Sequence, residues 1–244
     1  MPVSPDLARI AENDPAIRVS RVELRRPDTT LPAYTAAPRN AGPRTPGVVL
    51  VLHIWGVDEP VREAARRFAA AGFAAIAPEL FVRSGAPDGD GQTDYTIFRP
   101  HAEKLRKDRV DGDLRAAALW LKNAHPQGKI AVAGFCMGGM IALRQAIDNA
   151  DVFDADVVWY GKVAGFDPTA IRMPLVGHFG ERDTGIPADE VRAFRKALRG
   201  PHDILIYPTA GHAFFDHTRP SYVAPAAADS WRRTIAFLTK YLRA

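Results

Sequence analysis

The chain of 244 residues contains a single cysteine, Cys136. One thiol cannot form an intramolecular disulfide, so a disulfide-stapled secreted fold is excluded and a reducing compartment, the cytoplasm, is expected. No apolar run approaches the roughly 20 residues that a membrane-spanning helix needs, so no membrane partner is expected. The N-terminal stretch lacks the basic and then apolar segments of a secretory signal, and none is predicted.

Basic residues are also not clustered, although the net charge is +4. The densest basic stretch, residues 18–26, alternates as the exposed face of a strand does. A nucleic-acid-binding surface would show basic residues grouped with aromatic ones. The sequence therefore predicts a solvated basic surface and no nucleic-acid partner.

Short apolar runs alternate with amphipathic helical patterns along most of the chain. The expected strands are 19–24, 32–36, 47–54, 73–77, 130–133, 156–160, 174–179 and 204–207; the expected helices are 58–71, 101–123, 140–147, 189–198 and 226–241. Residues 81–99 are expected to form a loop long enough to be functional. This alternation predicts a single α/β domain over 18–244, with a mainly parallel central sheet flanked by helices, after an N-terminal arm of residues 1–17.

The most informative stretch is KIAVAGFCMGGMIAL, residues 129–143. A short apolar strand leads into the tight turn GFCMGG, and an apolar helix follows. This is the context of a nucleophile elbow, with Cys136 where serine usually lies. Glycines are needed on both sides because the nucleophile's backbone is strained and the strand and helix come close. A phosphate-binding loop is excluded by the glycine spacing and the missing GK[ST] ending, which leaves a buried structural cysteine as the alternative.

A cysteine nucleophile needs a base, and the base needs an acid to orient it. Asp183 follows the strand expected at 174–179, and His212 follows the strand expected at 204–207. Such loops meet at the carboxyl edge of a parallel sheet. The order of nucleophile, acid and histidine is the one expected of α/β-hydrolase folds. Alternatives are the histidines His125, His178, His202 and His217 and the acids Glu181 and Asp216, although His202 precedes its strand and His178 lies within one.

Two backbone N–H groups are expected to stabilise the oxyanion, those of Met137 and of Ile54 in the loop after strand 47–54. The helix N-terminus and the histidine both favour the thiolate of Cys136. Thiolate is itself a good leaving group, so productive turnover requires an acyl group whose own leaving group is stabilised. Enol esters, enol lactones and aryl esters meet this requirement.

With GFCMGG at 134–139, FGERDTGIP at 179–187 and GHAF at 211–214, the chain resembles the dienelactone hydrolase family from about residue 48 to the C-terminal helix. The resemblance implies an α/β-hydrolase fold, no cofactor, and Cys136, Asp183 and His212 as the catalytic triad. It also implies Ile54 as the second oxyanion donor.

Two positions depart from the family pattern. The family commonly has a glutamate before the oxyanion loop, where it helps to form the thiolate, whereas this chain has His53. His53 therefore either tunes the thiol or fills the strand end. The family also has an arginine shortly after the catalytic histidine that holds the substrate carboxylate, and here none follows His212 before Arg219. Arg83, Arg99 and Arg219 are the candidate replacements.

Trp55, Tyr160 and Phe214, together with Phe98, are expected near Cys136, where they line an apolar substrate pocket; Trp55 and Tyr160 are alternatively core residues. The sequence thus predicts a cysteine-dependent hydrolase of a small ester or lactone, with no metal and acting as a monomer or homodimer. The alternative is a binding or redox-sensing protein on the same scaffold, favoured by His53 in place of glutamate.

Overall fold

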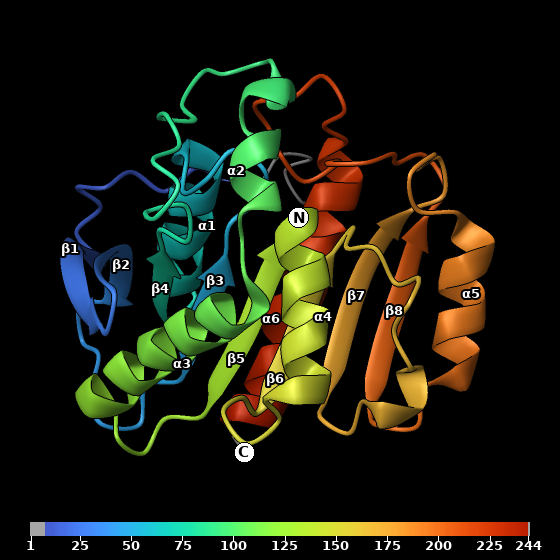
Figure 1. The fold of residues 1–244 in the computed structure, drawn as a ribbon. Helices are drawn as coiled ribbons and strands as arrows, with labels where there is room; N and C mark the ends of the chain where they lie inside the picture. The colour runs from blue at the N-terminus through green and yellow to red at the C-terminus, as the bar shows by residue number, and fades with distance from the viewer. Residues whose placement is uncertain (1–7, 244) are drawn as a thin grey trace. The chain divides into compact units, whose positions relative to one another are not determined.

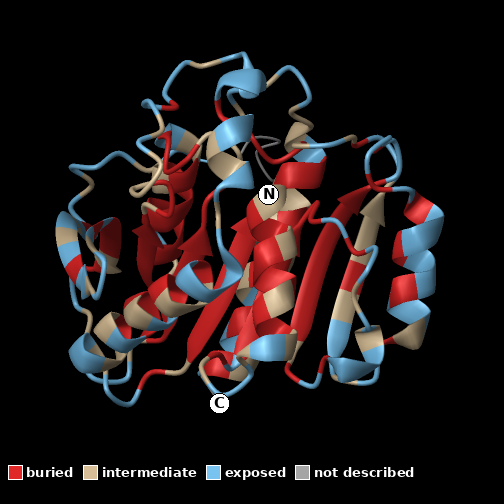
Figure 2. Ribbon diagram, viewed as in Figure 1, coloured by how far each residue is buried: buried red, intermediate tan, exposed pale blue. Residues whose placement is uncertain are grey.

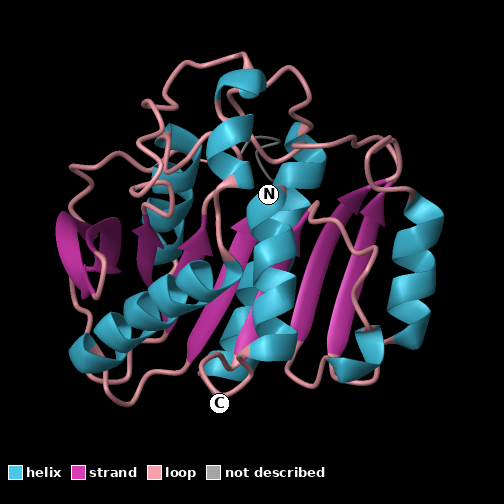
Figure 3. Cartoon of the chain, viewed as in Figure 1, coloured by secondary structure: helices cyan, strands magenta, loops and turns pink. Residues whose placement is uncertain are grey.

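The computed structural model describes residues 8–243 and contains one eight-stranded, mostly parallel sheet flanked by helices (Figures 1 and 3). The strand order is β1-β2-β4-β3-β5-β6-β7-β8, as expected for the predicted α/β class. The strands are β1 (Ile17–Arg26), β2 (Thr29–Pro38), β3 (Gly47–Val51), β4 (Ala74–Pro78), β5 (Ile130–Phe135), β6 (Ala155–Trp159), β7 (Leu175–Gly180) and β8 (His202–Tyr207). The helices are α1 (Glu59–Ala70), α2 (Arg99–Glu103), α3 (Lys107–Ala124), α4 (Met137–Asp148), α5 (Ala188–Ala197) and α6 (Ala224–Leu242).

The chain divides within β5 into two compact units. We call residues 10–132 the N-terminal unit; residues 133–243, with residues 8 and 9, form the C-terminal unit. Each unit has its own strands and its own covering helices, and each is described separately.

In the N-terminal unit, register determines which helix covers which face of the sheet. Tyr34 of β2 pairs with Ala77 of β4, and its hydroxyl accepts a hydrogen bond from Arg66 of α1 at 3.1 Å. Gly47 of β3 pairs with Ala74 of β4, three residues before Ala77 and so on the other face, and a Cβ placed there would be 2.9 Å from Leu121 of α3. Helices α1 and α3 therefore cover opposite faces, and β3 and β4 are buried along their whole length (Figure 2). Parallel strands covered on both faces read as continuous apolar runs, as these do.

In the C-terminal unit, β6, β7 and β8 are parallel. Trp159 of β6 and His178 of β7 are paired neighbours that both bond α6, through Ser230 at 3.3 Å and Thr234 at 2.8 Å. Figure 1 shows α4 in front of β6 and α6 behind it. Burial lowers the pKa of His178 to about 3, so this histidine is neutral and structural. It is packed within its strand, as the sequence predicts.

Two local helix predictions were wrong. The helix expected at 101–123 is two helices, because the backbone at Arg106 is extended (φ −93°, ψ 133°) and no glycine or proline marks the break. Helix α4 starts at Met137 and not at residue 140, directly after the turn. The loop expected at 81–99 contains a short 3-10 turn, Tyr95–Ile97. Residues 1–7 of the expected arm lie outside the described residues.

Within residues 8–243, none of the helices combines the length and the apolar character needed to cross a bilayer.

Candidate active site

Cys136 lies at the sharp turn between β5 and α4. Its backbone has φ 55° and ψ −118°, a left-handed conformation that is strained for a residue with a Cβ. The turn is held because the Cys136 N–H donates to the carbonyl of Trp159 at 3.0 Å and its carbonyl accepts from Met140 at 3.1 Å. The side chain is half-buried. Met137, the first residue of α4, presents one of the N–H groups that an α-helix leaves without an intrahelical partner.

Glycines allow the backbones around this turn to touch. A Cβ on Gly134 would lie 2.1 Å from the carbonyl oxygen of Gly138, on the far side of the turn. A Cβ on Gly139 would lie 2.8 Å from the Trp159 oxygen, and one on Gly161 would lie 2.4 Å from the Gly139 carbonyl carbon. Strand, helix and the segment after β6 therefore meet with no room for side chains, which is the physical reason for the glycines predicted around the nucleophile.

The histidine expected from the sequence reaches the cysteine, and the expected acid reaches that histidine. The Nε2 atom of His212 is 3.0 Å from the Cys136 sulfur, and its Nδ1 atom is 2.7 Å from Oδ2 of Asp183. The Asp183 carboxylate is 2% exposed, and its Oδ1 accepts N–H bonds from Gly185 at 2.9 Å and Ile186 at 3.2 Å. Because a carboxylate only accepts, Nδ1 carries a hydrogen and Nε2 faces the sulfur.

These contacts change the proton affinity of the imidazole. Desolvation acts to lower the pKa of His212, but the hydrogen bonds to Asp183 and Cys136 and the charges of both groups outweigh it and raise the pKa to about 10. The protonated ring opposite the sulfur is therefore the dominant form at neutral pH. The ring is 41% exposed, so solvent reaches the proton that it carries.

The alternative bases and acids have other partners. Asp216 accepts bonds from the Thr218 N–H and hydroxyl at 2.9 and 2.7 Å, and Glu181 pairs with Arg192 at 2.6 Å. His125 bonds the Gly42 carbonyl at 2.8 Å, and His202 begins β8 at the end remote from the strand's carboxyl terminus. In the described part of the chain, the carboxylate that bonds His212 is thus that of Asp183.

Tyr160 takes the core position that the sequence left open as its alternative, and Phe214, expected in the substrate pocket, is also a core residue. Tyr160 is 2% exposed and Phe214 0%. The Tyr160 ring packs its edge against His212 with centroids 5.2 Å apart, and Phe214 packs against Tyr160 at 5.4 Å. The Tyr160 ring therefore supports the imidazole of His212, and the Phe214 ring supports Tyr160. Among the described residues, the non-glycine residues with positive φ are Cys136, Tyr160 (40°) and Ala213 (58°).

The other predicted site residues lie in the N-terminal unit, on the turn of residues 53–58 between β3 and α1. Ile54 and Trp55 are half-buried, and Trp55 packs edge-on against Phe98 at 5.4 Å. Trp55 also lines a cavity of about 410 Å³ that contains Glu79. His53 is buried, with Nε2 2.7 Å from Oδ1 of Asp58.

Glu79 is a titratable group that the sequence did not single out. Burial is the largest influence and raises the pKa of this carboxyl to about 7, against the opposing charges of Arg62 and Arg21. Its only signal in the sequence is the Pro-Glu pair that closes strand β4, which does not distinguish a buried carboxyl from an exposed one.

The three arginines considered for a substrate carboxylate already face carboxylates of this chain. Arg83 pairs with Asp28 at 2.9 Å and with Asp113 at 2.6 Å. Arg99 pairs with Glu103 at 3.0 Å, and Arg219 lies 3.4 Å from Asp216. Over residues 8–243, no group of three or more His, Cys, Asp or Glu side chains is arranged to hold a metal ion.

Comparison with known proteins gives concordant results. The model of the dienelactone hydrolase family matches residues 31–242. A provisionally named carboxymethylenebutenolidase of Escherichia coli (strain K12) is 35% identical over 226 residues, covering 86% of this chain and 83% of its own length. One of Yersinia pestis, with the same provisional name, is 38% identical, covering 86% and 84%. The crystal structure of a provisionally named dienelactone hydrolase from Klebsiella pneumoniae has a TM-score of 0.83 at 33% identity and covers 93% of this chain and 100% of its own.

Proposed function

Because this chain belongs to the dienelactone hydrolase family and is a hydrolase acting on esters or lactones, we propose that it works through a Cys136–His212–Asp183 triad and a covalent acyl-enzyme. The observation that carries the proposal is the pair of hydrogen bonds made by the His212 imidazole, to Asp183 Oδ2 at 2.7 Å and to the Cys136 sulfur at 3.0 Å.

The triad accounts for each proton in the reaction. The Cys136 thiolate attacks the ester carbonyl carbon, and the new oxyanion accepts hydrogen bonds from the N–H groups of Met137 and Ile54. His212 gives its Nε2 proton to the departing alkoxide or enolate as the C–O bond breaks. Neutral His212 then takes a proton from water, the resulting hydroxide attacks the thioester, and thiolate leaves. His212 is again protonated and the acid product is released.

The chemistry of the leaving group supports a restricted substrate class. When the tetrahedral adduct collapses, thiolate competes with the alkoxide, and only a stabilised leaving group departs first. We therefore assign small aryl esters, enol esters or enol lactones as substrates. The pairing of Arg83, Arg99 and Arg219 with carboxylates of the chain supports acyl groups without a carboxylate of their own. The need to keep one thiol reduced supports a cytoplasmic location.

The test is hydrolysis of phenyl acetate. We expect a burst of phenol equal to the enzyme concentration, an acetyl adduct on Cys136 by mass spectrometry, and loss of turnover in Cys136→Ala. Phenyl acetate should be hydrolysed faster than its analogue with a carboxylate at the end of the acyl chain. Full turnover by Cys136→Ala would contradict the proposal. Acylation without release would favour the alternative of a binding or sensing protein.

A further inference from the structure

The turn of residues 53–58 carries the Ile54 N–H, and little backbone pairing fixes its shape. It contains one isolated bridge, in which the Gly56 N–H donates to the His53 carbonyl at 3.2 Å, and Gly56 has φ +84°. A backbone donor is useful in catalysis only when its direction is held before the oxyanion forms. The direction of this N–H therefore depends on the side chains that tie the turn together.

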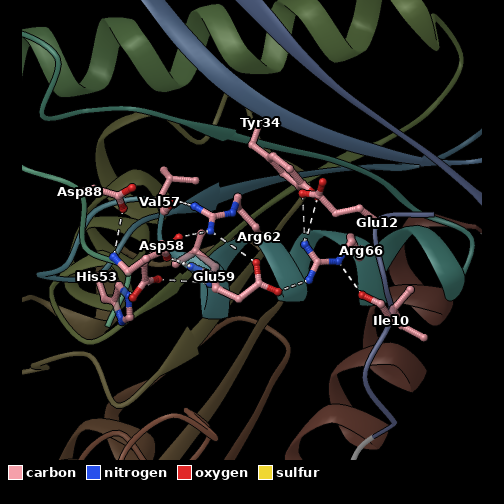
Figure 4. A network of polar contacts seen from close by, with 12 residues as sticks. Ile10, Glu12, Tyr34, His53, Val57, Asp58, Glu59, Arg62, Arg66 and Asp88 are labelled. Atoms are coloured by element: carbon pink, nitrogen blue, oxygen red, sulfur yellow. Dashed lines mark hydrogen bonds and ion pairs between the residues drawn. The ribbon is translucent and has the colours of Figure 1, made fainter. Parts of the chain in front are cut away.

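A buried pair joins the two ends of the turn. His53 Nε2 lies 2.7 Å from Asp58 Oδ1, and the two side chains are 7% and 2% exposed. Since the carboxylate accepts, Nε2 carries the hydrogen and that face of the imidazole is committed to Asp58. Asp58 also begins α1, where Oδ1 accepts the Val61 N–H at 3.4 Å. One carboxylate thus links the strand end, the turn and the helix (Figure 4).

A second set of contacts holds Val57, next to Asp58, from the other side. Arg62 reaches back from α1 and donates to the Val57 carbonyl at 2.8 Å (Figure 4), and its second terminal nitrogen bonds Asp90 at 2.5 Å. The C-terminal end of the turn is therefore fixed to the helix. What remains to be fixed is the strand end, where His53 directly precedes Ile54.

We propose that His53 and Asp58 are a positioning pair that holds the Ile54 N–H in the direction an oxyanion donor requires. The inference rests on the proposed function, in which Ile54 supplies the second donor. His53 acts through the backbone of the turn, not by exchanging a proton with the Cys136 thiol. This assigns a role to the histidine that replaces the expected glutamate, and it adds Asp58, which no sequence motif marks.

The experiment separates two reactions of the same sulfur. Ester hydrolysis needs an oxyanion hole, whereas alkylation of Cys136 by iodoacetamide is a displacement that forms no oxyanion. In His53→Leu we expect kcat for phenyl acetate to fall about 100-fold, as on loss of one oxyanion donor. KM and the alkylation rate should stay within about threefold, since neither depends on that donor. His53→Gln keeps an N–H donor for Asp58 but cannot act as a base, and it should recover most of kcat.

Asp58→Ser is the second variant, because serine keeps the helix N-cap but removes the carboxylate, and it should match His53→Leu. His125→Leu is the matched control: it also removes a histidine bond to a loop of the N-terminal unit, at Gly42, and should leave kcat unchanged. Wild-type kcat in folded His53→Leu or Asp58→Ser would overturn the inference. So would equal losses in alkylation and hydrolysis, which would show that His53 acts on the thiol. In both cases Cys136→Ala would still be inactive, whereas failure of the proposed function appears as hydrolysis by Cys136→Ala itself.

Discussion

Asp183→Asn removes one negative charge while keeping the size of the side chain, and the structure defines how the asparagine must lie. Oδ1 of Asp183 accepts two backbone N–H groups, from Gly185 and Ile186, while Oδ2 accepts the Nδ1–H of His212. Asparagine has one oxygen, and two fixed donors hold it at the Oδ1 position. Its NH₂ group then faces Nδ1, which must accept. The hydrogen of a neutral imidazole moves to Nε2, the wrong tautomer for taking a proton from water.

The size of the loss follows from this change of tautomer. The same fault in a Ser-His-Asp triad lowers kcat by about 10⁴-fold, which is about 5.4 kcal/mol at 1.36 kcal/mol per tenfold.

The pH profile should change as well. Asp183 helps to raise the pKa of His212 to about 10, and kcat/KM falls as pH rises through that pKa because the leaving group loses its acid. In Asp183→Asn this alkaline limb should move toward neutral pH.

The assay is kcat and kcat/KM for phenyl acetate between pH 6 and 11, with a thermal melt to establish folding. Asp216→Asn is the matched control, since Asp216 is also a buried carboxylate beyond the end of a parallel strand, in its case β8, but bonds Thr218. We expect its kcat to stay within about threefold of the wild type, because the triad is untouched. Activity of Asp183→Asn within tenfold of the wild type, with the alkaline limb unmoved, would refute the assignment of Asp183.

Three further predictions concern stability. Gly161→Ala places a Cβ 2.4 Å from the Gly139 carbonyl carbon and should cost about 1–3 kcal/mol in urea unfolding, with a fall in kcat as the elbow shifts. Asp156 is fully buried, neither carboxyl oxygen has a partner among the described residues, and burial raises its pKa well above the ordinary value. Asp156→Val should therefore stabilise the protein by about 1–3 kcal/mol at pH 7, with the gain shrinking toward pH 4; destabilisation would show an unseen partner. Burial raises the pKa of Glu79 from 4.5 to about 7, so the wild type should lose stability as pH rises from about 4.5 to 7 and Glu79→Gln should not. The difference should be at most about 3 kcal/mol, and parallel profiles would contradict it.

The sequence predicted the elbow and its partners because their constraints are local or topological. Glycine at 134 and 139 is required by backbone contact around Cys136, and a contact of that kind leaves its mark on the sequence itself. Asp183 and His212 were found because parallel strands bring the loops at their carboxyl ends together. Neither inference needed the position of any distant side chain.

The features that escaped prediction depend on tertiary packing. Tyr160 and Phe214 lie in the right segments, but whether an aromatic ring at a strand end faces a pocket or the core depends on what fills the space beside it. The His53–Asp58 bond requires the chain to fold back over a turn of six residues, which neither residue type specifies. The break between α2 and α3 at Arg106 carries no glycine or proline, so periodicity continues across it.

The distribution of backbone strain bears on whether the scaffold only binds a ligand or also turns it over. In the described residues, positive φ outside glycine occurs at Cys136, the proposed nucleophile, at Tyr160 whose ring supports His212, and at Ala213 beside that histidine. Each such residue costs of order 1–3 kcal/mol, and the three together are a substantial part of a typical stability of 5–15 kcal/mol. A binding protein gains nothing from using strained backbone to hold a sulfur and an imidazole 3.0 Å apart. A hydrolase does, because His212 must give its proton to the leaving group and take one from water beside the acyl carbon bonded to that sulfur at every turnover.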